Sequence, residues 1–219
     1  MDYKKEISKT INYLSGSKSP YDIFCDWIAL MALALANASC LIHSKIWHER
    51  ENQYKNIVQR YPKEDFQKFV YMFGLLANAF EERLTDWLGQ IYMESGCGNK
   101  NTGQFFTPFN VSQMCAMSTI PDDYDGSYPL TVNEPSTGGG GMIIAMANAL
   151  KEKGLNFQAC MKVVAQDLDW KGVYMTYTQL SLLGIDAIVV QGDTLLEPYT
   201  SNYPRQRVFR TLRNMGGLL

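Results

Sequence analysis

Helical spacing of apolar residues dominates the first part of the chain. Apolar side chains recur every three or four positions between Tyr21 and His43, and Asp22 just after Pro20 is typical of a helix start. The stretch from Ile46 to Arg60 mixes charged and apolar residues at the same period. It predicts an amphipathic helix, which ends where a proline follows.

A third helical stretch begins near Lys63 and carries aromatic and aliphatic residues as far as Tyr92, with Gly74 as a candidate break. A polar, glycine-rich segment over residues 95–103 follows it. Such a shift in composition is typical of a domain border. We therefore expect a helical N-terminal domain over residues 1–100 and a different domain over residues 101–219.

The second part alternates short β-branched runs with helical stretches. Runs typical of buried strands lie at Leu130–Asn133, Cys160–Ala165 and Ala187–Val190. Helical patterns lie between them at Met142–Lys153 and Trp170–Leu183, and each is followed by a helix-ending glycine, Gly154 and Gly184. This alternation predicts an α/β domain with parallel strands and right-handed crossovers.

Composition narrows the classes of protein. With 46% hydrophobic residues in 219, the chain can form a core, so global disorder is excluded. The net charge of -2 excludes a chain-wide basic field. The five cysteines form no CxxC pair, so we expect no disulfide framework and no metal site. The longest apolar run, Trp27–Ala36, is too short to span a bilayer, and we expect a cytoplasmic protein with no membrane partner.

A glycine run lies at the first predicted strand-to-helix turn, in Glu134-Pro135-Ser136-Thr137 followed by Gly138–Gly141. Alone it is compatible with a simple flexible turn. Two acids, Asp167 and Asp193, lie at the ends of the next two strands. They favour the interpretation that the glycine run is part of a ligand-binding site. The carboxyl ends of parallel strands meet at one edge, where open α/β sheets bind ligands, and an acid after the second strand is typical of ribose recognition.

The order of these blocks resembles the adenine-N6 DNA methyltransferases, in particular the methylation (M) subunits of type I restriction-modification systems. The blocks are Gly103-Gln104-Phe105-Phe106-Thr107-Pro108, the glycine run after Glu134-Pro135, Asp167-Leu168-Asp169 and Gly192-Asp193-Thr194-Leu195. The segment from Asp86 to Tyr92 resembles the stretch upstream of them. The resemblance implies a shortened Rossmann-like, S-adenosylmethionine-dependent methyltransferase domain.

The resemblance also implies roles for single residues. At the methionine end of S-adenosylmethionine, Phe105, Thr107 and Pro108 would line the site, Glu134 would lie beside the amino group, and Gly138 and Gly140 would allow close approach. At the nucleoside end, Asp167 would accept from the ribose hydroxyls, Leu168 would pack on the adenine ring and Asp193 would accept from the adenine amine. Glu134 replaces the Asp that is more usual in this family.

The resemblance stops before the family's catalytic element, Asn/Asp-Pro-Pro-Tyr/Phe, which positions a flipped-out base. No two of the eight prolines are adjacent, and Glu197-Pro198-Tyr199 is only weakly similar to this element. We therefore assign no catalytic residue. After Asp193 the sequence is also too short for the remaining strands and a target-recognition region of a complete enzyme.

Two functions remain open. The chain takes part in DNA adenine methylation while a partner supplies the missing catalytic parts, or it is a catalytically silent cofactor-binding or interaction module. A nicotinamide-dependent enzyme is disfavoured because the Phe-Thr-Pro block has no role there. Candidate partners are DNA, a second copy of the chain, and a partner methyltransferase or specificity subunit. Four arginines between Arg205 and Arg213 suggest either a phosphate-contacting tail or a solvated or partner-facing segment, and the apolar residues 215–219 suggest that this end packs against something.

Overall fold

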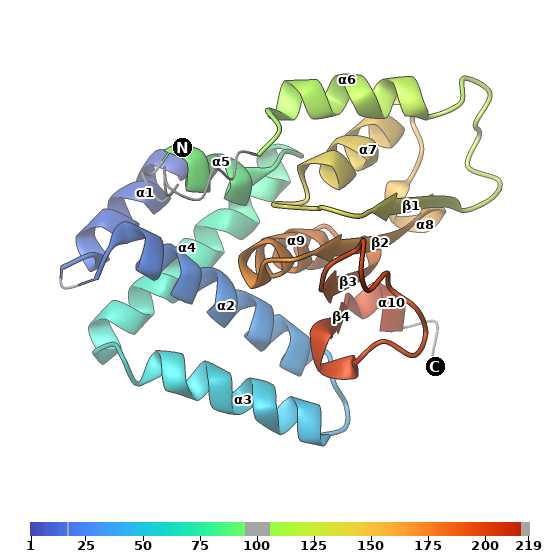
Figure 1. The fold of residues 1–219 in the computed structure, drawn as a ribbon. Coiled ribbons are helices and arrows are strands. Elements are labelled where there is room, and N and C mark those ends of the chain that lie inside the picture. Colours follow the sequence, from blue (N-terminus) through green and yellow to red (C-terminus); the bar gives the residue numbers. More distant parts are fainter. Residues whose placement is uncertain (17, 95–105, 216–219) are drawn as a thin grey trace. The chain divides into compact units, whose positions relative to one another are not determined.

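The computed structural model describes residues 1–16, 18–94 and 106–215 (Figure 1). Its contacts divide the chain into two compact units. Unit 1 comprises Met1–Arg83 and Trp87–Phe105, and unit 2 comprises Leu84–Asp86 and Phe106–Leu219. The short segment before Trp87 thus belongs with the second unit. The expected division into two domains at residue 100 stays a prediction.

Unit 1 is helical over its described residues. Its helices are α1 (Tyr3–Leu14), α2 (Pro20–Ala38), α3 (Lys45–Val58), α4 (Lys63–Glu82) and α5 (Trp87–Glu94). The helices expected from Tyr21 and from Ile46 are confirmed, and α2 ends earlier than the pattern predicts. Ser39 to Ser44 connect it to α3, whose start is capped by the Ser44 hydroxyl accepting from Trp47 N–H.

Helix α2 is the apolar centre of unit 1. Ser19 and Asp22 form a reciprocal capping box at its start, with Pro20 in the first turn. Trp27, Phe24 and Ile28 are among its fully buried side chains. By length and composition alone α2 could cross a membrane, but 61% of its most apolar window is buried inside the protein. These properties are typical of a core helix.

The candidate break at Gly74 is wrong. Helix α4 runs without interruption from Lys63 to Glu82, and the break comes at Arg83, which is extended. A single glycine weakens a helix by only about 1 kcal/mol. The buried aromatic and aliphatic face of α4, with Phe69 and Leu76, supplies enough packing to carry the helix past Gly74.

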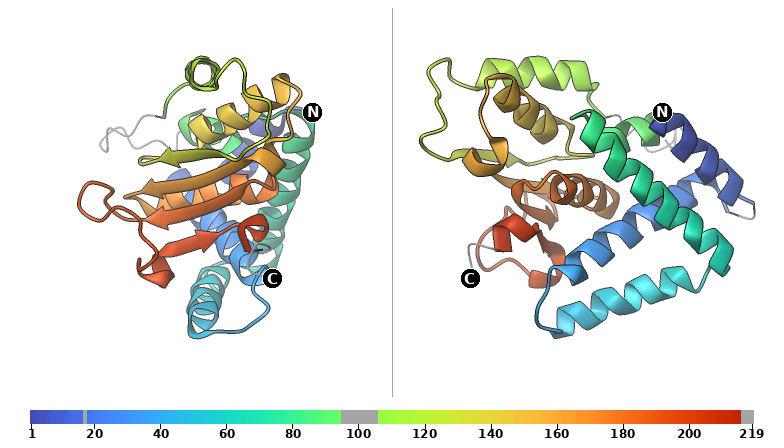
Figure 2. Two further views of the ribbon diagram at one scale, coloured as in Figure 1. Left: turned by 90° about the vertical axis from the view of Figure 1, so that its right-hand side faces the viewer. Right: turned by 180° about the vertical axis from the view of Figure 1, so that it is seen from behind.

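Unit 2 is a mixed α/β structure with a four-stranded sheet in the order β1-β2-β3-β4. The strands are β1 (Leu130–Glu134), β2 (Met161–Asp167), β3 (Asp186–Gln191) and β4 (Val208–Arg210). The helices are α6 (Phe109–Thr119), α7 (Gly141–Glu152), α8 (Phe157–Cys160), α9 (Trp170–Leu182) and α10 (Leu212–Met215), with a 3-10 turn at Arg205–Arg207. Strands β1, β2 and β3 are parallel, which confirms the predicted βαβ pattern (Figures 1 and 2).

Helices cover mainly one face of this sheet. Because β1, β2 and β3 follow one another in one direction, right-handed crossovers place α7 and α9 on the same face. The side chains in register on that face of β2 and β3 are buried: Met161, Val163, Ala165, Asp167, Ala187 and Val189. On the opposite face Thr131, Asn133 and Lys162 are exposed.

The C-terminal part folds back onto the sheet as a fourth strand, which the sequence analysis did not predict. Strand β4 pairs antiparallel with β3, and buried Phe209 packs its ring 5.0 Å from that of Tyr177 on α9. Arg207 binds Glu197, and Arg210 donates to Tyr199 Oη. These two arginines thus bond within the chain, and the expected phosphate-contacting, solvated or partner-facing role of the segment stays a prediction. A three-residue strand is too short to show a period in the sequence.

We predict that Gly74→Ala stabilises the protein by about 1 kcal/mol, because alanine is the better helix former and a Cβ at Gly74 meets nothing within 4 Å. Gly154→Ala is the matched control: the space is equally open, but φ is +78°. There we expect a loss of about 1 kcal/mol, since an L residue is strained in the left-handed region. Urea unfolding checks both values, and stabilisation of both variants to the same extent would contradict this account.

Candidate functional site

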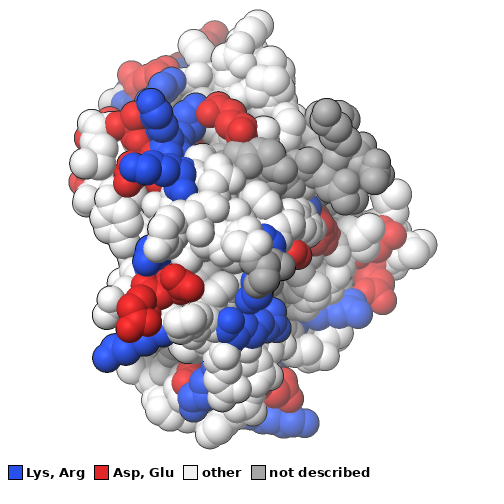
Figure 3. Space-filling view, turned by 90° about the vertical axis from the view of Figure 1, so that its left-hand side faces the viewer, with Lys and Arg blue, Asp and Glu red and all other residues white. Residues whose placement is uncertain are grey.

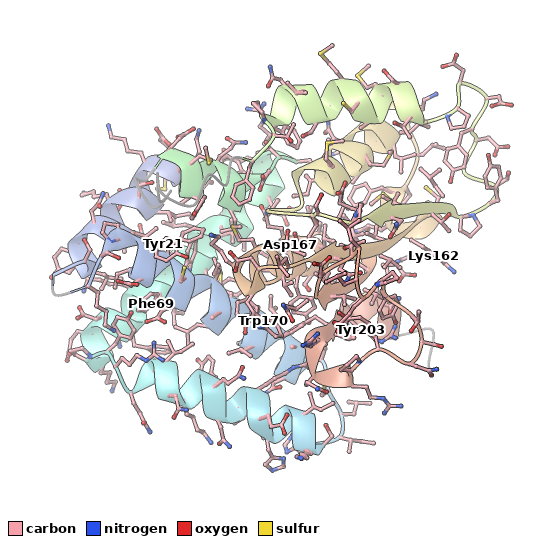
Figure 4. All side chains as sticks on the ribbon, viewed as in Figure 1. Tyr21, Phe69, Lys162, Asp167, Trp170 and Tyr203 are labelled. Carbon is pink, nitrogen blue, oxygen red and sulfur yellow. The ribbon has the colours of Figure 1, made fainter. Side chains whose placement is uncertain are left out.

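Three acids lie at the carboxyl edge of the parallel strands. Glu134 ends β1 and Asp167 ends β2, while Asp193 follows the end of β3 at Gln191. The register pairs Glu134 with Ala165 and Asp167 with Gln191, so the three strand ends lie next to one another. Figure 4 shows Asp167 and Lys162 at opposite ends of β2. The predicted meeting of these acids at one edge is confirmed as a matter of topology.

The Asp167 carboxylate connects β2 to the glycine loop. Its Oδ2 accepts from Gly138 N–H at 2.7 Å, and its Oδ1 accepts from Asp169 N–H at 2.9 Å. Gly172 on α9 leaves room for it, because a Cβ there would lie 2.7 Å from the carboxyl carbon. Burial raises the pKa of Asp167, whereas the bonds from Asp169 and Gly138 and the charge of Lys171 act in the opposite direction.

The glycine loop takes a path that side chains would obstruct. Gly138 has φ of +55°, and a Cβ there would lie 2.8 Å from the ring of Phe106. Gly140, the N-cap of α7, has φ of +88°, and its Cβ would lie 3.2 Å from the hydroxyl of Thr176. No side chain caps α7. The first turn of a helix presents N–H groups that favour an anionic or polar ligand.

The loops after the strands also bond to one another. Thr194 Oγ1 donates to the Pro135 carbonyl at 2.6 Å, which joins the loop after β3 to the loop after β1. Asp193 Oδ1 accepts from the N–H groups of Leu195 and Leu196. Glu134 Oε1 accepts from Ser136 N–H at 3.2 Å. Glu134 and Asp193 are thus held by backbone donors of their own loops, whereas Asp167 also accepts from the glycine loop.

The remaining predicted site residues do not all lie at the carboxyl edge of the strands. Thr107 is exposed, and so is Pro108, which is the N-cap of α6, the helix that packs against α7. Leu168 is 67% exposed beside Asp167. Phe105 lies outside the described residues. The structure therefore brings Gly138, Gly140 and the three acids together, whereas it shows Thr107 and Pro108 only at the start of a neighbouring helix.

Sequence reasoning missed four residues that support the glycine loop. They are Asp86, Phe106, Thr176 and Gln179. Phe106 and Asp86 stand inside blocks that carried the resemblance, but no pattern assigned them a contact with the loop. Thr176 and Gln179 are three positions apart on α9, so they lie on one helix face. This spacing alone does not distinguish them from other buried polar residues.

The segment Glu197-Pro198-Tyr199 has a structural role. Gln166, buried in β2, donates through Nε2 to the Glu197 carbonyl and accepts at Oε1 from Tyr199 N–H. The Glu197 carboxylate binds Arg207 at 2.8 Å, and the hydroxyl of Tyr199 accepts from Arg210. These contacts fix the segment to the sheet and to the strand that follows.

The arrangement offers both hydrogen-bond acceptors and donors to a polar ligand. Each carboxylate oxygen of Asp167 keeps a second lone pair after its backbone bond, so two hydroxyl donors can still be accepted. The glycine loop offers close approach of backbone to ligand, and the uncapped α7 offers N–H donors. Among the described residues, no group of three or more His, Cys, Asp or Glu side chains is arranged to hold a metal ion.

Comparison with known protein families shows to which family the chain belongs. The family described as N-6 DNA Methylase matches residues 85–210, more than half of the chain. The chain belongs to the N-6 DNA methylase family. The match covers the sheet, the glycine loop and the acids at the strand ends, and it begins at Thr85, next to Asp86. The resemblance to the adenine-N6 DNA methyltransferases, inferred from the sequence blocks, is thereby confirmed.

One solved structure similar to this N-6 DNA methylase family member is the methyltransferase subunit of a type I restriction-modification system from Streptococcus thermophilus. The two chains are 16% identical, and the TM-score is 0.48. The match covers 92% of this chain and 41% of the Streptococcus subunit, so the chain spans less than half of that subunit's length. No curated protein matches the sequence.

We predict that Asp167→Asn lowers the free energy of unfolding by about 1–3 kcal/mol. Two N–H groups donate to two different oxygens of Asp167, and an amide has only one oxygen, so its NH2 group would face a donor. Urea unfolding at neutral pH measures the change.

Asp193→Asn is the matched control, since Oδ1 of Asp193 accepts the bonds from both Leu195 and Leu196 and an amide keeps that oxygen. We expect it to change stability by less than about 0.5 kcal/mol. Equal losses in the two variants would contradict the roles assigned to the Asp167 oxygens.

Proposed function

We propose that this chain binds S-adenosylmethionine at the carboxyl edge of β1–β3 and takes part in DNA adenine-N6 methylation, with a partner supplying the missing catalytic parts. The observation that carries the proposal is the 2.7 Å bond between Gly138 N–H and Asp167. It unites the glycine loop with the acid of the next strand in a member of the N-6 DNA methylase family.

The nucleoside would lie along the ends of β2 and β3, in a Rossmann-like arrangement. Asp167 would accept from the ribose hydroxyls through its remaining lone pairs. Leu168, whose side chain is largely exposed, would pack on the adenine ring, and Asp193 would accept from the adenine amine. The two acids would therefore act as hydrogen-bond acceptors, and Leu168 would provide an apolar surface for the flat base.

The methionine part would lie over the glycine loop. Gly138 and Gly140 would let the backbone approach the ligand, and Glu134 would sit beside the positive amino group. Thr107, Pro108 and Phe105 would line this end. When bound, S-adenosylmethionine supplies an electrophilic methyl group on its sulfonium. The chain's own residues bind and orient that ligand.

Contact with DNA would depend on a partner or a second copy. On the face shown in Figure 3, basic and acidic groups lie beside one another across the described residues. Two of the four C-terminal arginines are already bonded within the chain. Since affinity for DNA comes largely from unpaired cations near phosphates, this chain would contribute little of it alone. We place the assembly in the cytoplasm.

A second candidate is a catalytically silent cofactor-binding or interaction module. One observation favours it: the Glu197-Pro198-Tyr199 segment, the only echo of the catalytic element in the sequence, is bonded to Gln166, Arg207 and Arg210. These bonds give the segment a structural role within the chain, which is what a silent module would keep.

Calorimetry with S-adenosylmethionine tests the binding site. We expect wild type to bind and Asp167→Ala to bind roughly tenfold to a hundredfold more weakly, because hydrogen bonds to a charged acceptor contribute about 1.5–3 kcal/mol. Asp123→Ala, which removes an exposed carboxylate in the loop before β1, is the matched control and should bind like wild type. Equal binding by Asp167→Ala and wild type removes Asp167 from the site.

Labelled methyl transfer separates the two functions. The tagged chain is purified from its host with whatever assembles on it, and incorporation of labelled methyl groups into DNA adenine is measured. Under the proposal the assembly methylates DNA, and the Asp167→Ala assembly does so at least tenfold more slowly. An assembly that binds the cofactor but transfers no methyl group supports the silent module.

A further inference from the structure

A buried carboxylate lies directly beneath the glycine loop and belongs to none of the three strand ends. Asp86 is only 5% exposed, and it stands in the short segment Leu84–Asp86 that packs with unit 2. A carboxylate out of water is costly unless hydrogen bonds compensate for the lost solvation. We therefore expect hydrogen-bond donors around the Asp86 carboxylate.

Gln179 on α9 connects this carboxylate to the loop. Its Nε2 donates to Asp86 Oδ1 at 2.8 Å and to the Gly139 carbonyl at 2.6 Å, and the side chain is fully buried. The amide nitrogen has two hydrogens, and both are used. Rotating the amide by half a turn would place its oxygen against two acceptors, so Asp86 fixes the orientation in which Gln179 holds Gly139.

The carboxylate also sets where the loop can run. A Cβ at Gly139 would lie 3.0 Å from both Asp86 oxygens, and a Cβ at Gly141 would lie 3.2 Å from one of them. The loop therefore packs directly on the carboxylate. On the same face of α9, Thr176 Oγ1 donates to the Gly138 carbonyl at 3.0 Å. Two consecutive carbonyls of the loop thus point toward α9.

The direction of these carbonyls decides where the loop amides point. No described peptide bond is cis, and in a trans peptide the N–H points opposite to the C=O of the same unit. The N–H groups of Gly139 and Gly140 consequently point away from α9. The Gly140 N–H closes the turn on the Thr137 carbonyl at 2.8 Å. The Gly139 N–H is left directed away from the helix that holds the loop.

We propose that Asp86 is a positioning residue: through Gln179 it holds the glycine loop in the conformation that presents its backbone to the ligand. Its effect on affinity rests on the proposed function. Its effect on the loop does not, because every contact invoked is within the chain itself.

Amide hydrogen exchange tests the effect on the loop without any ligand. In Asp86→Ala we expect exchange over residues 136–142 to accelerate at least roughly tenfold, which corresponds to losing about 1.4 kcal/mol of local protection. Exchange over β3 serves as the internal reference for global stability. Asp86→Asn keeps an oxygen that can accept from Gln179, so it should restore most of the protection.

Gln179→Met provides a second variant in case Asp86→Ala fails to fold. It keeps the side-chain length but removes both hydrogen bonds, and it should release the same segment. Asp123→Ala is the control for loss of a carboxylate. Unchanged exchange over 136–142, relative to β3, in both Asp86→Ala and Gln179→Met would overturn the proposal.

Calorimetry with S-adenosylmethionine then connects the loop to binding. Asp86→Ala should bind roughly tenfold more weakly than wild type, and Asp86→Asn should recover most of the affinity. If Asp86→Ala and wild type bind equally, Asp86 does not position the loop for this ligand. If wild type itself fails to bind, the proposed function is wrong, while the exchange experiment still decides the positioning role.

Discussion

The bond between Gly138 N–H and the Asp167 carboxylate is the interaction on which the candidate site depends. It joins a turn after β1 to the end of β2, so it forms only when those two strands are paired in register. Burying the carboxylate costs solvation energy, which the bonds from Gly138 and Asp169 offset. The bond thus holds the carboxylate of Asp167 in one position at the carboxyl edge of the sheet.

Around this bond, α9 acts as the support of the loop. Gly172 makes room for Asp167, Thr176 holds the Gly138 carbonyl, and Gln179 holds the Gly139 carbonyl. These residues recur at every third or fourth position, so one face of one helix reaches both the acid and the glycines. Glycine is required in the loop because neighbouring side chains occupy the space of a Cβ, and at Gly138 and Gly140 also because φ is positive.

The two faces of the sheet differ in how far they are covered. Parallel strands are ordinarily covered by helices on both faces. Here the face of α7 and α9 is buried, whereas the opposite face exposes Thr131, Asn133 and Lys162. At the carboxyl end of that face Gln166 and Val190 are buried, and Gln166 bonds to the segment around Glu197. The bonded Glu197-Pro198-Tyr199 segment thus has a structural role in the fold.

Local pattern was sufficient for the three parallel strands, for the two helices that connect them and for the meeting of the acids at one edge. The strands at Leu130 and Ala187 and the crossover helices follow from apolar period and glycine stops, and parallel pairing then necessarily brings Glu134, Asp167 and Asp193 to one edge. The family resemblance rested on the same blocks and is confirmed by the match over residues 85–210.

Only the tertiary structure decided the rest, because those features depend on contacts between residues far apart in the chain. Packing along α4 overrides the weak helix propensity of Gly74. Strand β4 is too short to have a period and exists because Phe209 packs on α9. Asp86 reaches the glycine loop through Gln179, 93 positions away. No local pattern contains such a contact, since hydrogen bonding between distant side chains is set by where the backbone carries them.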